Sequence, residues 1–373
     1  MKKICFVVSS PYTAIAFLKS IITALSKHFD VYLIANLNGH ENKLLSKLEV
    51  KEIFHFNIVR KISLFKDLIC TIKLINFLKK NKFDAIHSIS PKAGIISMIA
   101  GFFSMTPKRI HTFTGQVWHA KKGLSKLILK NIDRLIVFCS TDILVDGKSQ
   151  LNFLEKNNVI SDKGLVLLNG SISGVNLNRF SLSNKVRNEK RNQLKIRKDE
   201  WVFMFLGRLN KDKGVIDLIK AFTLIDQKKY NCSLYLVGHD EENIKSNYCS
   251  FSPKIKFLPH EEKPEELLQA CDTFCLPSHR EGFGLSVIEA SALKRPIVCS
   301  DTYGLKDTII KNKTGLTHPV GDVLNLNQKL KYCLTRKKNI RKMGENGRKF
   351  VEDRFNELNV IAEWERFYIN SVN

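Results

Sequence analysis

Short apolar runs of the kind that form strands alternate with helix-like segments along the chain, and this alternation occurs twice. In the first half, we expect strands at 4–9, 30–35, 85–88, 109–113, 135–139 and 164–168, and helices at 14–27, 64–80, 94–105 and 124–132. In the second half, we expect strands at 202–206, 232–237, 255–257, 273–276 and 297–299, and helices at 214–224, 264–270 and 286–293. Alternating strands and helices predict parallel sheets that are covered by helices on both faces.

The predicted fold class is therefore α/β, with two consecutive doubly wound domains. A length of 373 residues suits two domains better than one hydrophobic core. We expect an N-terminal domain at 1–178, a charged connection at 179–200, a second domain at 201–354, and a C-terminal helix at 355–373 that could pack back towards the first domain. Ligands of such sheets bind beyond the carboxyl ends of the strands, so we expect the chemistry in the cleft between the two domains.

Composition narrows the class of protein. A chain that is 44% hydrophobic and 26% charged is neither collagen-like nor largely disordered. The apolar run at 4–8 is too short for a secretory signal, and the run at 93–105 falls short of the ~20 residues that span a bilayer, so we expect no membrane-crossing segment. The nine cysteines are dispersed without a Cys-x-x-Cys pair, which favours reduced thiols in the cytoplasm over disulfides or a zinc site.

The net charge of +24 is unevenly distributed, because residues 1–180 hold 26 Lys and Arg against 11 Asp and Glu. Such a basic surface attracts polyanions, either nucleic acid or the anionic face of a membrane. Residues 121–130 are basic and amphipathic, and an interfacial helix gains ~1 kcal/mol per cation near anionic lipid. The alternative is a solvated lysine face over an ordinary core stripe. The charge of this half tips the balance towards membrane contact.

Two acidic residues flank a glycine-containing loop after the expected strand at 273–276. Gly282 and Gly284 let a ligand approach the backbone closely, and the free amides of the following helix favour a phosphate. Glu281 stands just before this anion site, and Glu289 lies about one turn inside the helix. Carboxylates so placed would repel a phosphate, so we expect them to bind hydroxyl groups instead.

A second pair of charged residues follows the first strand of the second half. In the segment 205–214, Arg208 and Lys213 stand between the end of a strand and the start of a helix. Two cations there could neutralise a diphosphate and the charge that grows on it as a bond breaks. Each cation alone is common on protein surfaces, whereas both together with the glutamate pair indicate a binding site.

These segments resemble the retaining glycosyltransferases of family 4, which have the GT-B fold of two Rossmann-like domains, and the resemblance covers essentially the whole chain. The Glu281-x7-Glu289 pair matches the family signature. The resemblance implies that Glu281 lies against the donor sugar and that Glu289 holds the ribose hydroxyls, while Arg208 and Lys213 stabilise the leaving diphosphate. The further donor-binding residues that it implies are Gly207, Gly238, Phe257, Leu258, Gly282, Phe283, Gly284 and Leu285, with Phe257 and Leu258 near the base.

The segments 86–94, 111–118 and 168–180 resemble the subgroup that builds O-antigen and capsule repeat units. Many of its members carry a histidine just before the glycine that aligns with Gly115, and this chain has Thr114 there. Strand alternation would turn His111 to the opposite face from Thr114, and a lone strand histidine is usually structural. Residues 9–13 replace the glycine-rich first loop of many relatives. The candidate acceptor or donor-sugar contacts are Thr13, Lys92, His111, Thr114 and Gly115.

The resemblance implies transfer of a sugar from a nucleotide diphosphate, a UDP-sugar rather than a GDP-sugar, to a polyprenyl-diphosphate-linked glycan in bacterial polysaccharide biosynthesis. We expect no metal or cofactor, since cations and helix amides can stabilise the charge and the chain has no Asp-x-Asp triplet. The enzyme is expected in the cytoplasm, at the inner face of the cytoplasmic membrane. The alternatives are a sugar-nucleotide epimerase, a non-catalytic scaffold, and a basic nucleic-acid-binding protein. The last lacks the motifs of that class, so we expect no nucleic-acid partner.

Overall fold

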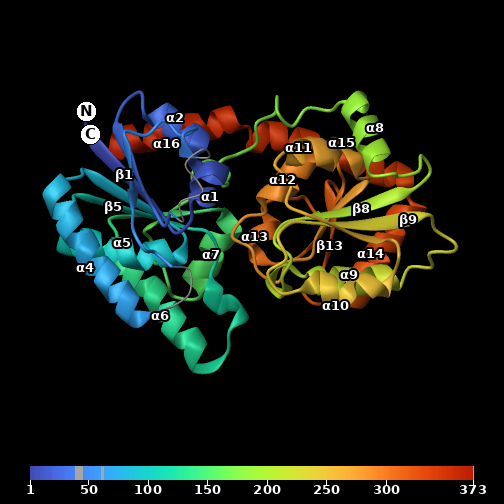
Figure 1. Cartoon of the computed structure of the whole chain (residues 1–373), viewed down its shortest axis with the longest axis horizontal. Coiled ribbons are helices and arrows are strands. Elements are labelled where there is room, and N and C mark those ends of the chain that lie inside the picture. Colours follow the sequence, from blue (N-terminus) through green and yellow to red (C-terminus); the bar gives the residue numbers. More distant parts are fainter. Residues whose placement is uncertain (38–44, 60–62, 373) are drawn as a thin grey trace. The chain divides into compact units, whose positions relative to one another are not determined.

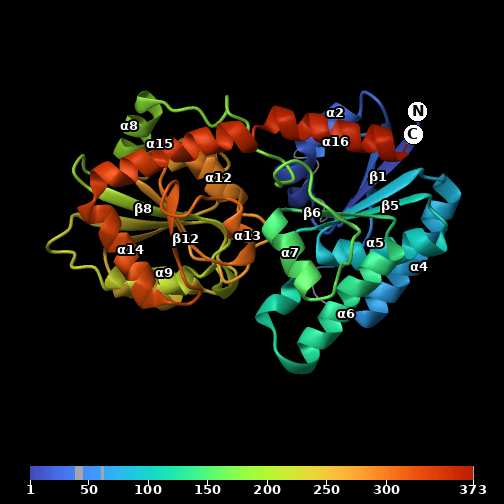
Figure 2. The same ribbon diagram turned by 180° about the vertical axis from the view of Figure 1, so that it is seen from behind.

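The computed structural model describes residues 1–37, 45–59 and 63–372 of the chain (Figures 1 and 2). By its internal contacts the chain divides into two compact units, Met1–Gly174 with Glu357–Asn373, and Val175–Asn356. Each unit is built on its own sheet, which has seven strands in the first unit and six in the second. All neighbouring strands in both sheets run parallel, which confirms the predicted α/β class.

The first sheet has the strand order β3-β2-β1-β4-β5-β6-β7. Its strands are β1 Lys3–Val8, β2 Asp30–Ala35, β3 Glu52–His55, β4 Ala85–Ile89, β5 Lys108–Phe113, β6 Asp142–Val145 and β7 Gly164–Leu165. The helices of the first unit are α1 Pro11–Thr13, α2 Lys19–Leu25, α4 Leu64–Asn81, α5 Pro91–Phe103, α6 Gly123–Cys139, α7 Lys148–Lys156 and α16 Glu357–Val372. Strands β1 and β4 are almost continuous runs of buried residues, because helices cover both faces of the sheet.

Helices α4, α5 and α6 lie side by side on one face of this sheet, and α2 and α16 cover the other (Figures 1 and 2). The last helix, α16, completes the first unit although it follows the second in the sequence. Its Trp364 indole donates a hydrogen bond to the carbonyl of Ile172 at 2.9 Å, and the Tyr368 hydroxyl lies 2.6 Å from Nδ1 of His87. The buried ring of His87 also stacks on Trp364. These contacts fix α16 on the sheet.

The second sheet has the strand order β10-β9-β8-β11-β12-β13. Its strands are β8 Trp201–Leu206, β9 Cys232–Val237, β10 Ile255–Leu258, β11 Thr273–Leu276, β12 Ile297–Ser300 and β13 Gly315–His318. The helices of the second unit are α8 Asn184–Gln193, α9 Val215–Thr223, α10 Ile244–Tyr248, α11 Pro264–Leu267, α12 Leu285–Ala292, α13 Tyr303–Lys306, α14 Val323–Thr335 and α15 Lys337–Arg354. Helices α9 and α14 pack together on one face of the sheet, and α12 and α15 on the other (Figure 1).

One predicted strand is wrong, because residues 135–139 form the last turns of α6 rather than a strand. Ile136 and Cys139 point into the core while Leu135 and Phe138 are exposed, so the run continues the one-sided helical pattern that starts at Leu124. A short run of branched and aromatic residues suits a strand or a helix equally well on local grounds. The next strand, β6, begins only at Asp142.

The polar stretch at 179–200 contains α8, which packs within the second unit. The Ser183 hydroxyl accepts a hydrogen bond from the amide of Val186 and caps this helix. Arg187 and Arg191 both form ion pairs with Asp272, at 2.5 and 3.2 Å. The abundant charge of the segment therefore serves partly to attach it to the end of the loop before β11. The other elements that were not predicted are α1, β3, β6, α7, α10, α13, β13, α14 and α15.

Candidate functional site

The two charged motifs of the second unit meet at the point where its strand order reverses. Strands β8 and β11 are neighbours, and the chain continues from β8 to one side of the sheet and from β11 to the other. The carboxyl ends of strands at such a reversal form the usual ligand crevice of a doubly wound sheet. The segment with Arg208 and Lys213 follows β8, and the segment with Glu281 follows β11. Topology therefore brings residues about 70 positions apart to one edge.

The backbone around Lys213 is fixed by a short capped turn. The buried Asn210 accepts a hydrogen bond from the amide of Lys213 at 3.0 Å, which caps the 3-10 turn Lys211–Lys213. Gly214 then has φ +68°, and a Cβ there would lie 2.0 Å from the carbonyl oxygen of Pro277. Only glycine allows this approach of the β8–α9 connection to the β11–α12 connection. The approach places the Lys213 side chain beside Glu281.

The carboxylate of Glu281 is held by two donors. The Lys213 ammonium forms an ion pair with Oε1, and the Ser278 hydroxyl donates to the same oxygen at 3.0 Å. Ser278 is fully buried, and its carbonyl accepts a hydrogen bond from the Ser300 hydroxyl. The other carboxylate oxygen, Oε2, accepts no hydrogen bond from the residues that the structure describes. Glu281 is thus fixed in position with one oxygen available to a ligand hydroxyl.

A carboxylate of the neighbouring loop holds Arg208. Its Nη1 donates to both oxygens of Glu241, at 3.0 and 2.8 Å, and the Asn210 amide donates to Oε2 of Glu241 at 2.7 Å. Glu241 follows β9, which pairs with β8, so the sheet itself brings the two residues together. A guanidinium that binds a carboxylate can bind a phosphate with the same donors. Glu241 and a diphosphate would therefore compete for the donors on Nη1 of Arg208.

Glu289 lies in α12, partly buried, and accepts no hydrogen bond from the described residues. Loss of solvation raises the pKa of its carboxyl to about 7. Arg179 opposes this shift and Glu265 adds to it, and these two residues form their own ion pair at 2.7 Å. A carboxylate that lacks donors in a poorly solvated position is suited to accept hydrogen bonds from the hydroxyls of a ligand.

The remaining predicted donor-binding residues lie around the same edge of the sheet. The amide of Gly207 bonds to the carbonyl of Val237, and the amide of Gly238 bonds to that of Leu258 at 3.2 Å. A Cβ on Gly238, whose φ is +141°, would lie 1.9 Å from the carbonyl oxygen of Gly207. Phe257, Phe283 and Leu285 are partly buried, and Gly282 and Gly284 are buried. Phe283 packs edge-on against Phe355, with ring centroids 5.3 Å apart, so its ring supports the loop.

Sequence reasoning missed several residues that position these groups. Asn210 could have been recognised, since an asparagine three residues before Lys213 is a typical cap. Nothing in the sequence indicated the contact of Glu241 with Arg208, which joins separate segments, or the bond from Ser278 to Glu281 three residues later in the same loop. Neither was there a signal for His279, whose Nε2 lies 2.6 Å from Asp217; this hydrogen bond raises the pKa of the histidine above its usual value. Arg280 pairs with Asp212 at 2.9 Å and ties the same two connections together.

The candidate acceptor residues all belong to the first unit. Thr13 ends α1, and Lys92 lies in the first turn of α5, where it forms an ion pair with Asp67 of α4. Thr114 and Gly115 follow β5, and Gly115 has φ +117°.

His111 lies inside β5 and is fully buried. Its Nδ1 is 2.8 Å from the Ser88 hydroxyl, and a Cβ at Gly94 would collide with its ring. Burial lowers its pKa to about 3, so the ring is neutral. The described residues contain no group of three or more histidine, cysteine or acidic side chains placed to hold a metal ion.

Comparison with known proteins identifies the family. Residues 3–145 match the family model described as glycosyl transferase 4-like, and residues 186–350 match glycosyl transferases group 1. A capsular polysaccharide biosynthesis glycosyltransferase, CapM of Staphylococcus aureus, is 30% identical over 352 residues, which cover 92% of this chain and 90% of the relative. A UDP-Gal:alpha-D-GlcNAc-diphosphoundecaprenol alpha-1,3-galactosyltransferase of Escherichia coli is 26% identical over 356 residues, 93% of this chain and 90% of that enzyme.

Solved structures agree on the fold. HepE of Anabaena, solved in complex with UDP, superposes with a TM-score of 0.79 at 17% identity, over 99% of this chain and 100% of that one. WaaG, a glycosyltransferase involved in lipopolysaccharide biosynthesis, superposes with a TM-score of 0.74 at 15% identity, over 96% and 98% of the two chains. These likenesses confirm the predicted GT-B fold. The chain belongs to the group 1, family 4-like glycosyltransferases, and it is a glycosyltransferase enzyme.

Proposed function

We propose that this enzyme transfers a sugar from a UDP-sugar to a polyprenyl-diphosphate-linked glycan in bacterial surface polysaccharide biosynthesis, with retention of the anomeric configuration. The observation that carries the proposal is the Lys213–Glu281–Ser278 cluster at the reversal of the second sheet. The relatives support the choice of acceptor. An enzyme of Campylobacter jejuni, 27% identical over 272 residues, is also named for a diphospho-undecaprenol-linked substrate.

The donor site follows from the charges at this edge. Arg208 and Lys213 donate hydrogen bonds to the diphosphate, and Glu281 accepts from a hydroxyl of the sugar through Oε2. The lysine ammonium has three donors, so it can keep Glu281 and bind a phosphate oxygen at once. Glu289 accepts from the ribose hydroxyls, and Phe257 and Leu258 border the base. The glycines at 207, 238, 282 and 284, with Phe283 and Leu285, supply backbone that a ligand can approach.

The reaction needs no additional base. The bond between the anomeric carbon and the β-phosphate oxygen breaks, and UDP leaves with the electron pair. The acceptor hydroxyl oxygen bonds to the anomeric carbon on the same face, which retains the configuration. Its proton passes to the leaving phosphate oxygen. Arg208 and Lys213 stabilise the charge that grows on the diphosphate, so we expect transfer without added divalent metal and without a cofactor.

We assign the acceptor to the first unit, where Thr13, Lys92, Thr114 and Gly115 lie at or near the carboxyl ends of strands. Because His111 is buried beneath α5, we propose that it supports these loops rather than contacting a sugar. A polyprenyl-linked acceptor is held in a membrane, and the positive charge of residues 1–180 is consistent with peripheral contact at the anionic inner face of the cytoplasmic membrane. No helix among the described residues is long and apolar enough to cross a bilayer.

The test begins with calorimetric titration of the protein with UDP-, GDP- and CMP-sugars. The donor that binds is then supplied with lipid-linked acceptors, in buffer with and without a chelator, and the linkage of the product is determined by NMR. We expect a UDP-sugar to bind and the product to retain the donor configuration. Conversion of the donor to another sugar nucleotide without acceptor would identify an epimerase, and an inverted product would refute the proposed chemistry.

A further inference from the structure

The exposed apolar side chains of this protein are concentrated on three neighbouring helices of the first unit. Among the described residues, 25 large apolar side chains are exposed, and 12 of them lie on α4, α5 and α6. These helices hold only 48 of the 373 residues, so the concentration is far above an even distribution. The side chains are Leu64, Phe65, Leu68, Ile69, Ile72, Phe102, Phe103, Leu124, Leu127, Ile128, Leu135 and Phe138.

These side chains form stripes along the helices. On α4 they recur at positions 64, 68 and 72, one turn apart, with 65 and 69 beside them. On α6 they recur at 124, 127, 128, 135 and 138, a second helical stripe. The rings of Phe102 in α5 and Phe138 in α6 are in contact, with centroids 5.8 Å apart. Since α5 packs against both other helices, the stripes belong to one continuous surface, which we call the α4–α6 face.

The exposed charges of the α4–α6 face are all positive. The three helices contain eight basic and two acidic residues, and the structure describes all of them. Neither acid is exposed: Asp67 pairs with Lys92, and Asp133 is buried and accepts a hydrogen bond from the Trp118 indole at 2.7 Å. The exposed basic side chains are Lys66, Lys73, Lys79, Lys80, Lys126 and Arg134.

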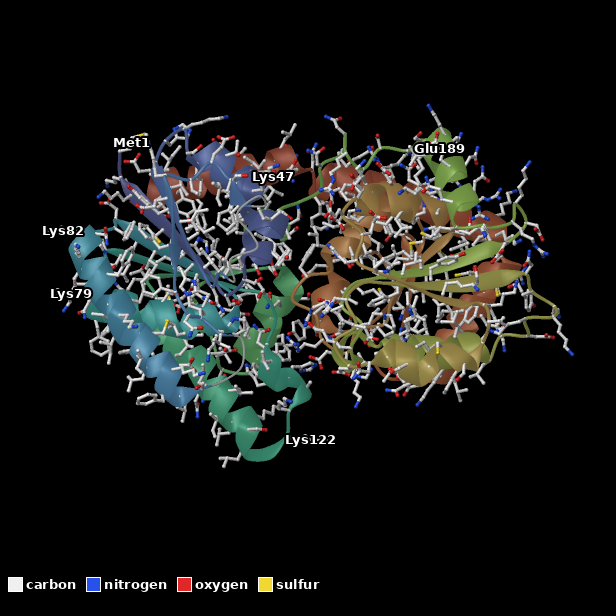
Figure 3. The ribbon with its side chains drawn as sticks, in the orientation of Figure 1. Met1, Lys47, Lys79, Lys82, Lys122 and Glu189 are labelled. Carbon is white, nitrogen blue, oxygen red and sulfur yellow. The ribbon has the colours of Figure 1, made fainter. Side chains whose placement is uncertain are left out.

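More lysines extend this cationic surface along the neighbouring loops. Lys122, just before α6, and Lys82, just after α4, project outward together with Lys79 (Figure 3). Lys130 lies 5.8 Å from the centre of the Trp118 ring, and its pKa is lowered by loss of solvation, with Arg134 and Lys126 adding to the effect. Arg134 and Lys126 thus lie close enough to Lys130 to repel it, and an anionic neighbour would relieve that repulsion.

We propose that the α4–α6 face is a membrane-binding surface that inserts its apolar side chains between the headgroups of an anionic bilayer. Helices that combine exposed Leu, Ile and Phe with a basic polar face lie in the interface of anionic membranes. A second copy of the chain is a poor occupant, because it would bring like charges together. That the enzyme works beside a bilayer rests on the proposed function, because its acceptor is lipid-linked. The residues that attach the enzyme to the bilayer are inferred from the α4–α6 face itself. The attachment is therefore both apolar and electrostatic, and extends beyond residues 121–130.

Vesicle sedimentation tests the proposal with the full-length protein. We expect binding to vesicles of phosphatidylcholine mixed with phosphatidylglycerol, and much weaker binding to phosphatidylcholine alone. Salt should weaken the binding without abolishing it, because only the electrostatic part is screened. The triple variant Leu124→Ser, Leu127→Ser, Ile128→Ser should lose at least about tenfold in affinity at low salt.

Charge removal is tested separately. The variant Lys66→Gln, Lys73→Gln, Lys126→Gln should bind anionic vesicles about 100-fold more weakly, at about fivefold per cation, and should lose most of the salt dependence. Matched controls replace exposed residues elsewhere. They are Leu324→Ser with Leu358→Ser for the apolar set, and Lys331→Gln, Lys338→Gln and Lys349→Gln for the charges. The controls should bind vesicles as the parent protein does.

Equal binding by parent and both face variants would overturn the proposal. So would light scattering that shows a dimer abolished by the apolar triple variant, since a second copy would then cover the face. UDP-sugar binding is measured by calorimetry on the same samples. Loss of donor binding with intact vesicle binding would count against the proposed function alone. Intact donor binding without vesicle binding in the parent protein would count against the membrane surface alone.

Discussion

The ion pair between Lys213 and Glu281 provides the sharpest test of the donor site. We consider Glu281→Gln, which keeps the size of the side chain and an oxygen that can accept from Ser278, but removes the charge opposite Lys213. Loss of one partner of a fully buried ion pair costs about 3–5 kcal/mol. The side chains of Lys213 and Glu281 are 19% and 10% exposed, so water screens part of this cost. We expect the free energy of unfolding to fall by about 1–3 kcal/mol.

Turnover should fall further than stability alone explains. If Glu281 orients the donor sugar in a poorly solvated site, loss of its charge should lower kcat by about 10²–10³, comparable to loss of one preorganised group in an active site. That corresponds to about 2.7–4 kcal/mol of transition-state stabilisation. The assay measures kcat and KM for the UDP-sugar at a temperature where chemical unfolding shows that both proteins are folded. The fall should appear in kcat more than in KM.

Two further variants separate stability from catalysis. Adding Lys213→Met to Glu281→Gln removes the unpaired ammonium, so the free energy of unfolding should return towards the parent value while turnover stays low. The control Glu363→Gln breaks the 2.6 Å pair with Arg366, whose guanidinium is 68% exposed and can turn to water, and should change stability by less than about 1 kcal/mol. Parent-like turnover of folded Glu281→Gln would refute the role assigned to Glu281.

Three other predictions concern the same unit. Glu241→Gln removes the carboxylate that competes with the diphosphate for Arg208. Calorimetry should therefore show tighter UDP binding by about threefold to tenfold, whereas weaker binding would mean that Glu241 supports the ligand-bound site. The pKa of Glu289 is raised to about 7, so the folded state holds this proton more tightly than the unfolded state does. The stability that the bound proton contributes is therefore lost as pH rises from about 4.5 to 7, whereas UDP affinity should rise across neutrality. Glu289→Gln should flatten both pH profiles, which are measured by unfolding and by calorimetric titration. Gly214 has φ +68°, and a Cβ there would lie 2.0 Å from the carbonyl oxygen of Pro277. Gly214→Ala should therefore lower the free energy of unfolding, measured with urea, by at least about 2 kcal/mol. An unchanged urea midpoint would contradict the close approach.

Local pattern was enough to predict most of the strands and to place the charged motifs directly after two of them. The strands at 30–35, 232–237 and 273–276 were predicted with the bounds that the structure shows, because buried parallel strands are short, apolar and bounded by polar residues. The motifs that contain Arg208 and Glu281 were found because both follow such strands directly, where a doubly wound sheet binds its ligands. The family resemblance added roles that spacing alone did not indicate.

Only the tertiary structure decided how α6 ends and what the charged residues contact. Residues 135–139 have the composition of a strand, but packing against β5 and α5 buries one side of them and keeps them helical. Glu241 reaches Arg208, and Lys213 reaches Glu281, because β8 lies between β9 and β11, whereas Ser278 lies only three residues before Glu281 in the same loop. The sequence determined which residues stand at strand ends; strand order determined which of them touch. The physical reason is that side-chain contacts depend on neighbours across the sheet, which lie tens of residues away along the chain.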